Sequence, residues 1–337
     1  IHIPGLNYRT QRYKESYDQL PQNLILGSET ASTVSSRGVY KFPVEDKKST
    51  KYEDHQCSSY DVEACSWSNI PDEDFALADD NHWTIGQFVW TGFDYLGEPS
   101  PYDTDAWPNH SSMFGIIDLA SLPKDRYYLY RSVWNKDAET LHILPHWTWP
   151  GREGEVTPVF VYTNYPTAEL FINGKSYGKQ SKNDSSLKNR YRLMWMDAVY
   201  EPGEVKVIAY NKDGKAVAEK VVRTAGKPHH IELVSNRNEL TADGKDLAYV
   251  TVKVVDKDGN LCPTDNRQIN FSAKGAGKYR AAANGDPTNL EQFHLPKMHT
   301  FNGMLTAIIQ AGETAGEIVF TAKANGVKAG NIRIQTK

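Results

Sequence analysis

The sequence predicts a multidomain chain in which an α/β part is followed by all-β parts, and three observations support this prediction. Apolar runs at residues 24–29 and 85–94 are typical of buried strands, the first of them ending abruptly on a carboxylate. The composition changes near Lys136 and again near Gly226. From about residue 139 onward, short segments with strand character alternate with turns, as in β-sandwiches.

The first part, residues 1–137, is rich in Trp and Tyr and mixes strands with helices. The run Leu24-Ile-Leu-Gly-Ser-Glu29 is the first predicted strand, and Ile85 to Asp94 is the second. Helix-like segments lie at 71–82 and 124–133. We therefore expect an α/β arrangement here.

The second part spans residues 138–226 and carries hairpin signals. Asn173-Gly174 stands between two strand-like runs and favours a type I′ turn, because both central residues of that turn need positive φ. The segments 205–210 and 216–222 form another hairpin around the turn Asn211-Lys-Asp-Gly214. These hairpins predict a β-sandwich.

The third part, residues 227–337, repeats this strand character without a clear internal sequence repeat. Its predicted strands are 231–235, 248–256, 268–273, 305–310, 316–324 and 329–335. The segment Tyr249 to Val255 alternates with period two, as expected when one sheet face is buried and the other is wet. We predict a second, immunoglobulin-like sandwich.

Length and charge exclude some classes of function. A chain of 337 residues is long enough for two or three compact units. A formal net charge of −4 shows no excess of basic residues, so nucleic-acid binding is not predicted. No apolar run approaches the roughly 18–20 residues that span a bilayer, so no membrane span is predicted.

The cysteines and acidic clusters do not predict a metal site or a cofactor. Cys57, Cys65 and Cys262 lack metal-ligand spacing, and their odd number argues against a disulfide framework. The spacing of Cys57 and Cys65 permits one bridge, but buried free thiols are expected instead. The acidic clusters lack the spacing of a calcium loop and are expected to be solvated. These clusters lie at 72–74, 79–80 and 103–105.

Taken in order, these motifs resemble the C-terminal region of glycoside hydrolase family 2, specifically its bacterial, Bacteroides-like β-galactosidases. The sixth, seventh and eighth strands of the family's (β/α)₈ barrel are resembled by segments 3–8, 24–32 and 87–99. The stretch that closes the barrel is resembled by 114–118 and 123–134. The family's accessory sandwich is resembled by 145–152 and 169–175. The resemblance implies that 1–137 is the C-terminal portion of a TIM barrel, with immunoglobulin-like sandwiches at 138–226 and 227–337. In that barrel, catalytic residues sit at C-terminal strand ends.

The activity implied by the resemblance is retaining hydrolysis of terminal β-D-galactosyl residues from oligosaccharides. A retaining glycosidase needs two carboxyl groups about 5 to 5.5 Å apart. In this family the acid/base is a Glu that follows an Asn, and no Asn-Glu pair precedes Glu29. We therefore expect the chain to be a C-terminal fragment that lacks the acid/base and is inactive alone.

Glu29, in Gly27-Ser-Glu-Thr-Ala-Ser32, matches the family's nucleophile, whereas without that motif it would more often be a capping or salt-bridged acid. By the same resemblance Tyr8 orients the nucleophile, although a Tyr near a strand end commonly packs in a core. Asn7 ranks below Tyr8, because alternation points it to the other face.

Three further residues are predicted to bind the sugar. Trp90 offers a platform for the apolar face of galactose, or it fills the barrel interior. Glu98 lies in the following loop and either binds sugar hydroxyls or is a solvated carboxylate. Phe114 stands where better-known members carry a sugar-binding Asn, which puts that contact and an associated alkali-metal site in doubt. His110 is the candidate to replace that Asn as a polar contact to the sugar.

Several alternatives remain open at this point. A β-glucuronidase or β-mannosidase of the same family is one, and a noncatalytic glycan-binding or structural fragment is another. An inverting hydrolase would use Glu29 with Glu98 about 6.5 to 9.5 Å apart. The segment His146-Trp-Thr-Trp149 fits domain docking better than glycan binding. The resemblance suggests a periplasmic or secreted protein, and homo-oligomer formation is left open.

Overall fold

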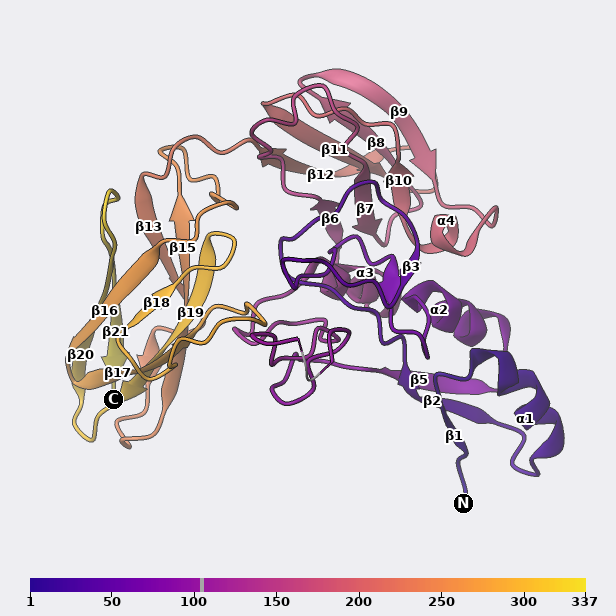
Figure 1. Cartoon of the computed structure of the whole chain (residues 1–337), viewed down its shortest axis with the longest axis horizontal. Helices are drawn as coiled ribbons and strands as arrows, with labels where there is room; N and C mark the ends of the chain where they lie inside the picture. The colour runs from indigo at the N-terminus through magenta and orange to yellow at the C-terminus, as the bar shows by residue number, and fades with distance from the viewer. Residues whose placement is uncertain (104–105) are drawn as a thin grey trace. The chain divides into compact units, whose positions relative to one another are not determined.

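A computed structural model describes residues 1–103 and 106–337, and its chain divides into two compact units. The first comprises residues 1–118 and 123–222, and the second comprises 119–122 and 223–337. The described part is mostly β, with a small α/β portion at the N-terminus (Figure 1). Asp105, from one of the predicted acidic clusters, lies outside the described residues.

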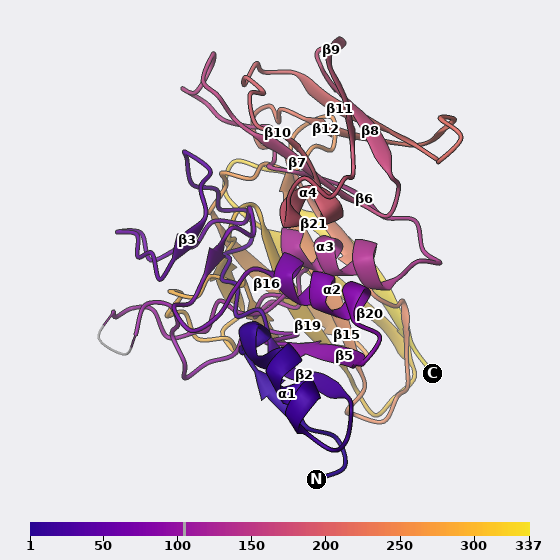
Figure 2. The same cartoon turned by 90° about the vertical axis from the view of Figure 1, so that its right-hand side faces the viewer.

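The N-terminal portion contains a small parallel sheet. Its strands are β1 (Gly5–Asn7), β2 (Ile25–Thr30) and β5 (Thr84–Val89), in the order β1-β2-β5. Parallel neighbours need crossover connections. These connections carry the helices η1 (Thr10–Arg12), α1 (Tyr13–Gln19) and α2 (Pro71–Asp80). Figure 2 shows α1 and α2 close to β2 and β5, where Tyr13, Ile25 and Trp83 form a small core.

The helices begin where the sequence supplies start signals. In α2, Pro71 stands in the first turn, followed by Asp72, Glu73 and Asp74, acidic residues typical of a helix N-terminus. Asp72 and Asp74 are buried, so the prediction that this cluster is solvated is wrong for them. Helix α3 spans Asp125–Trp134, within one residue of its predicted range at each end. A two-residue parallel pair, β3 (Lys47–Lys48) with β4 (Glu63–Ala64), lies in the long connection before α2.

Two further sheets complete the first unit. One contains β6 (Leu141–Leu144), β7 (Val159–Thr163) and β10 (Leu193–Trp195), in the order β10-β7-β6. The other contains β8 (Thr167–Ile172), β9 (Lys175–Ser181), β11 (Glu204–Tyr210) and β12 (Ala216–Arg223), in the order β12-β11-β8-β9, and the short helix α4 (Leu187–Tyr191) precedes β10. Asn173 and Gly174 both have positive φ, 49° and 81°, between antiparallel β8 and β9, which confirms the predicted hairpin.

Aromatic side chains join these sheets to the α/β portion. Phe160 and Tyr162 of β7 share a hydrophobic cluster with Tyr60, Phe75 and Leu129. Of the two tryptophans in the 146–149 segment, Trp147 is buried in the core of the sheets, whereas Trp149 packs edge-on against Phe42 at 5.4 Å and Tyr40 at 5.8 Å. Trp149 thus docks the sheets onto the α/β portion, and Trp147 does not form an exposed pair with it.

The second unit consists of two sheets around one core. Its strands are β13 (His230–Ser235), β14 (Glu239–Leu240), β15 (Leu247–Val255), β16 (Gln268–Gly275), β17 (Gly277–Ala283), β18 (Lys297–His299), β19 (Met304–Ala311), β20 (Gly316–Lys323) and β21 (Gly330–Thr336). The sheet orders are β13-β15-β19-β17 and β14-β21-β20-β16-β18. Ala248, Val250 and Val252 are fully buried while Tyr249 is 40% exposed, which confirms the predicted alternation.

Candidate active site

The C-terminal ends of the three parallel strands bring the predicted residues together. Asn7, the last residue of β1, pairs with Glu29 of β2, and the Tyr8 amide donates to the Glu29 carbonyl at 3.0 Å. On the other side, the Trp90 amide donates to the Thr30 carbonyl at 2.8 Å. Tyr8, Glu29 and Trp90 therefore follow one another along a single edge of the sheet.

A register shift in β2 sets the direction of the Glu29 side chain. Leu6 pairs with Gly27, but Asn7 pairs with Glu29, so Ser28 is an extra residue on β2. Up to Ser28 the burial alternates, with Ile25 and Gly27 buried; after it the phase changes, and Thr30 is buried while Glu29 is half-buried. The irregularity thus turns a carboxylate that strict alternation would bury toward the accessible face.

The residues that follow β1 and β2 both have left-handed backbones. Tyr8 has φ 54° and Ala31 has φ 46°. A bulky residue with this φ costs on the order of 1–3 kcal/mol and persists only where its surroundings hold it. Here the Tyr8 amide is held by the Glu29 carbonyl. This conformation at a strand end is a feature typical of functional sites.

The Tyr8 side chain interacts with the candidate nucleophile. Burial raises the pKa of the Tyr8 hydroxyl; the nearby Ser32 side chain opposes this, and the nearby Glu29 carboxylate raises the pKa further. Tyr8 therefore stays protonated at neutral pH and can donate to the carboxylate. Asn7 is exposed and accepts instead from the Ser28 hydroxyl at 2.6 Å, so only Tyr8 of the two neighbours is seen to interact with the Glu29 side chain.

Beyond β5, Trp90 is linked to Glu98 through Tyr95. The Trp90 and Tyr95 rings meet edge to face at 6.0 Å, and the Tyr95 hydroxyl donates to the Glu98 carboxylate. Burial raises the pKa of Tyr95, as do the hydrogen bond to Glu98 and, more weakly, the charge of Glu29. Trp90 is half-buried and Glu98 is exposed. The Glu98 and Glu29 carboxylates thus both raise the pKa of Tyr95.

His110 belongs to the same loop system but is engaged locally. Its carbonyl accepts from the Gly97 amide at 3.0 Å, next to Glu98. Its ring Nδ1 lies 2.9 Å from the Pro108 carbonyl, and the ring is 6.3 Å from that of Trp107. The backbone of His110 therefore supports the Glu98 loop, and its ring contacts Pro108 and Trp107 of the same loop.

Two residues of this arrangement were not predicted as site residues. Tyr95 lies in the segment between Trp90 and Glu98, and its spacing could have identified it as a bridge only if the loop conformation were known. Ser32 is fully buried beyond the end of β2 and lies near enough to Tyr8 to lower the pKa of its hydroxyl. A buried serine in a non-repeating segment carries no sequence signal for such a contact.

In the part of the chain that the structure describes, the cysteines and the possible metal ligands provide no second reactive site. Cys57, Cys65 and Cys262 are free and buried, as predicted. Within residues 1–103 and 106–337, no group of three or more His, Cys, Asp or Glu side chains could hold a metal ion. Among these same residues no helix is both long and apolar enough to cross a membrane.

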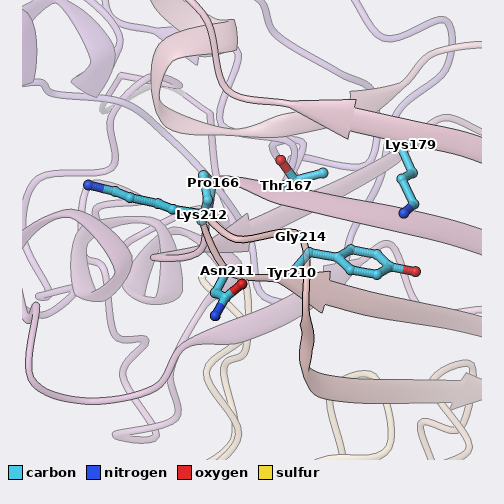
Figure 3. Close-up of a pocket in the computed structure, with 7 residues that line it drawn as sticks. All are labelled: Pro166, Thr167, Lys179, Tyr210, Asn211, Lys212 and Gly214. Atoms are coloured by element: carbon cyan, nitrogen blue, oxygen red, sulfur yellow. The ribbon is translucent and has the colours of Figure 1, made fainter.

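A hollow on the first unit lies away from these residues. It is lined by Pro166, Thr167, Lys179, Tyr210 and residues 211, 212 and 214, at one end of the β12-β11-β8-β9 sheet (Figure 3). The Lys179 ammonium lies 3.8 Å from the centre of the Tyr210 ring. The exposed ring face is therefore already covered by a cation, and none of the predicted site residues lines this hollow.

Two segments of the chain match described families. Residues 231–333 match the family described as glycoside hydrolase family 2 C-terminal domain 5, and residues 154–218 match a domain of unknown function, DUF4982. Both segments lie in the β-rich part of the chain.

Known proteins resemble all or a large part of the chain. A β-galactosidase of Bacteroides ovatus is 39% identical over all of this chain, which covers 39% of that protein. A putative β-glucuronidase of Formosa agariphila is 35% identical over 62% of the chain, or 20% of its own length. The crystal structure of a β-glycosidase from Bacteroides vulgatus superposes with a TM-score of 0.86 and 28% identity, over 99% of this chain and 45% of that one. The chain thus spans less than half the length of each relative.

Proposed function

The chain belongs to glycoside hydrolase family 2, and we propose that it carries the nucleophile side of a retaining β-galactosidase active site. The observation that carries this proposal is the placement of Glu29 at the end of a parallel strand, turned out by the irregularity at Ser28 and close enough to Tyr8 to raise the pKa of its hydroxyl. Terminal β-D-galactosyl residues are the proposed substrate of the complete enzyme, and a carbohydrate substrate follows from the family.

The proposed architecture is the C-terminal part of a (β/α)₈ barrel in residues 1–137, with immunoglobulin-like sandwiches at 138–226 and 227–337. The parallel order β1-β2-β5 with helical crossovers supports the barrel proposal. Paired sheets with shared cores support the sandwich proposals. Under this proposal, the chain alone is inactive, because the acid/base lies outside it.

In the first step of the proposed mechanism, a Glu29 oxygen attacks the anomeric carbon. A bond forms between them, the glycosidic bond breaks, and its electron pair leaves with the aglycone oxygen, which the acid/base residue protonates. In the second step, that residue deprotonates a water, which displaces Glu29 with net retention. In this mechanism the Tyr8 hydroxyl, which stays protonated beside Glu29, donates to it and orients the oxygen that attacks.

The sugar would be held by the residues after β5. We assign Trp90 as the platform for the apolar sugar face, because its ring is half-buried at the strand end beside Glu29. Glu98 would accept hydrogen bonds from sugar hydroxyls. His110 stays the weakest of the proposed contacts, since its ring already contacts the Pro108 carbonyl.

A second candidate activity is β-glucuronidase. It is favoured by the 35% identity to a putative β-glucuronidase, although this likeness covers only 62% of the chain. The likeness to the β-galactosidase covers all of it at 39%, so we place β-galactosidase first.

Trapping of the glycosyl-enzyme tests the proposal directly. The complete enzyme would be incubated with an activated 2-deoxy-2-fluoro-β-galactoside, digested, and analysed by mass spectrometry. We expect the label on the peptide that contains Glu29, and none in Glu29→Gln. As a matched control, Glu219→Gln makes the same charge change on an exposed carboxylate of β12, away from the site, and should still be labelled. Labelling at another residue would refute the assignment, and hydrolysis with inversion would support an inverting pair.

A further inference from the structure

Tyr95 is hydrogen-bonded to one carboxylate and feels the charge of a second. Its hydroxyl donates to Glu98, and the charged groups that act on it most strongly are Glu98 and Glu29. Its ring meets Trp90 edge to face at 6.0 Å. The nucleophile, the proposed sugar platform and Glu98 are therefore linked through a single side chain.

The segment that carries Tyr95 is anchored by a buried ion pair. Lys124 and Asp94 lie 2.7 Å apart with side chains that are 1% and 4% exposed. The second oxygen of Asp94 accepts from the Gly115 amide at 2.8 Å. Lys124 also donates to the carbonyl of Ser35 at 2.6 Å. The Lys124 ammonium is therefore buried and paired with Asp94, and it is not available to bind a sugar.

The loop beyond Asp94 is held on a second side by the 110–112 segment. The Tyr95 amide donates to the Ser112 hydroxyl at 3.0 Å, and the Ser112 amide donates to the Tyr95 carbonyl at 2.8 Å. Two residues further along, the Gly97 amide donates to the His110 carbonyl at 3.0 Å. Glu98 follows directly, with its side chain fixed by Tyr95. Its carboxylate is therefore preorganised although it is exposed.

The charges around this position favour a neutral sugar. A neutral glycoside offers hydroxyl donors, which a fixed carboxylate accepts without rearrangement. A hexuronide brings a carboxylate of its own, which needs a cationic partner and is repelled by the two carboxylates Glu98 and Glu29. Of the nearby cations, Lys124 is paired with Asp94, and Arg126 is buried and donates to the Thr33 carbonyl.

We propose that Glu98, held in place by Tyr95, makes this site select neutral hexosides over hexuronides. This inference rests on the proposed function and adds to it the substrate class and one positioning residue, Tyr95. The charge of Glu98 would then determine whether the site accepts a β-galactoside or a β-glucuronide, the substrates of the two activities found among the relatives.

The test compares two substrates in the complete enzyme. Rates with p-nitrophenyl β-galactoside and p-nitrophenyl β-glucuronide would be measured for the wild type, Glu98→Gln and Glu219→Gln. Glu219 is an exposed carboxylate on β12, so its variant makes the same charge change away from the site. We expect Glu98→Gln to shift the ratio of the two kcat/KM values toward the glucuronide by about tenfold or more, and Glu219→Gln to leave it unchanged.

Tyr95→Phe tests the positioning role. It keeps the ring against Trp90 and removes only the hydroxyl that holds Glu98. We expect KM for the galactoside to rise by about fivefold to tenfold with a smaller change in kcat, because ground-state and transition-state contacts weaken together. Loss of folding would lower the amount of active enzyme, and hence kcat, without this change in KM.

The outcomes separate the two levels of the proposal. If the wild type hydrolyses the galactoside and Glu98→Gln leaves the ratio unchanged, the selectivity inference is wrong while the proposed function stands. If the wild type prefers the glucuronide, the inference is overturned as well. If it hydrolyses neither substrate and is not labelled at Glu29, the proposed function fails and this inference fails with it.

Discussion

Arg192 and Asp72 form an ion pair in which both side chains are fully buried. Asp72 lies in the first turn of α2, and Arg192 stands between α4 and β10, so the pair ties the α/β portion to the sheets that follow. Arg192 also donates to the carbonyls of Tyr60 at 3.3 Å and Asp61 at 3.4 Å. Burial raises the pKa of Asp72, and the Arg192 charge opposes that rise.

Removing one partner of this pair should be far worse than removing both. Arg192→Leu leaves a buried, unpaired carboxylate, and we expect it to lower the free energy of unfolding by about 3–5 kcal/mol. In Arg192→Leu/Asp72→Leu neither member of the pair is left without the other, and the loss should be clearly smaller. Urea unfolding of the 337-residue chain would measure both. Equal losses in the single and double variants would show that the pair does not act through its charges.

Gly115 is required by close backbone contacts under the Glu98 loop. A Cβ at this position would lie within 3.0 Å of the Asp94 nitrogen, the Ile117 carbonyl oxygen and the Phe93 carbonyl carbon. Backbone atoms cannot move aside as a flexible side chain could. We therefore expect Gly115→Ala to destabilise the fold by about 3 kcal/mol or more.

Gly92→Ala is the matched control for Gly115→Ala. A Cβ on Gly92 meets no atom within 4 Å, so the change in the free energy of unfolding should stay within about 0.5 kcal/mol. Both variants would be compared by urea unfolding under the same conditions. A Gly115→Ala protein as stable as Gly92→Ala would mean that the 93–98 segment relaxes away from residue 115.

His146 should make the fold sensitive to mildly acidic pH. Its ring stacks on Trp149 at 4.1 Å, and burial lowers its pKa from 6.5 to about 4. Between these values the unfolded chain binds a proton that the folded chain does not, so stability rises with pH across this window and is lost as pH falls toward 4. The loss is at most about 3 kcal/mol.

The pH effect can be isolated with His146→Phe, which keeps an aromatic ring against Trp149 and cannot titrate. Urea unfolding at pH 7 and pH 4.5 would be measured for both proteins. Carboxylates contribute equally to the two, so the wild type should lose about 2 kcal/mol more than the variant on acidification. Identical pH dependence would mean that the ring is protonated in the folded state.

Local signals predicted much of the fold. The apolar run at 24–29, the Asn173-Gly174 turn and the alternation at 249–255 each depend on neighbours in sequence, and β2, the β8–β9 hairpin and β15 formed where these signals stand. The pairing of Arg192 with Asp72 joins residues 120 positions apart and has no local signal. Sequence therefore predicted the strands better than the contacts that join them.

The sequence supplied candidate residues for the site but not their geometry, and the roles of those residues stay predictions. Period-two alternation places Glu29 on the buried face with Ile25 and Gly27, and only the extra residue Ser28 reverses this. A bulge depends on the neighbouring strand, so one strand's sequence does not reveal it. The left-handed Tyr8 is unpredictable for a similar reason, because the Glu29 carbonyl of the neighbouring strand holds its amide.

Tyr8→Phe should impair the proposed nucleophile without disturbing the fold. The variant keeps the ring and removes the hydroxyl that interacts with Glu29 and Ser32. Since burial and Glu29 both raise the pKa of Tyr8, the hydroxyl is a donor at every pH at which the enzyme would work. Losing a preorganised donor to a reacting oxygen typically costs about 10² to 10³ in kcat, and we expect a loss in that range for the complete enzyme.

Tyr17→Phe is the control for this loss, because it removes a tyrosine hydroxyl from the same α/β portion. The Tyr17 ring stacks on Trp83 at 4.5 Å, and the variant retains that stack. Its kcat should equal that of the wild type, and urea unfolding should show that neither variant is destabilised by more than about 1 kcal/mol. If Tyr8→Phe keeps full kcat while the trapping experiment still labels Glu29, then Glu29 is oriented by other groups, and Tyr8 only packs at the strand end.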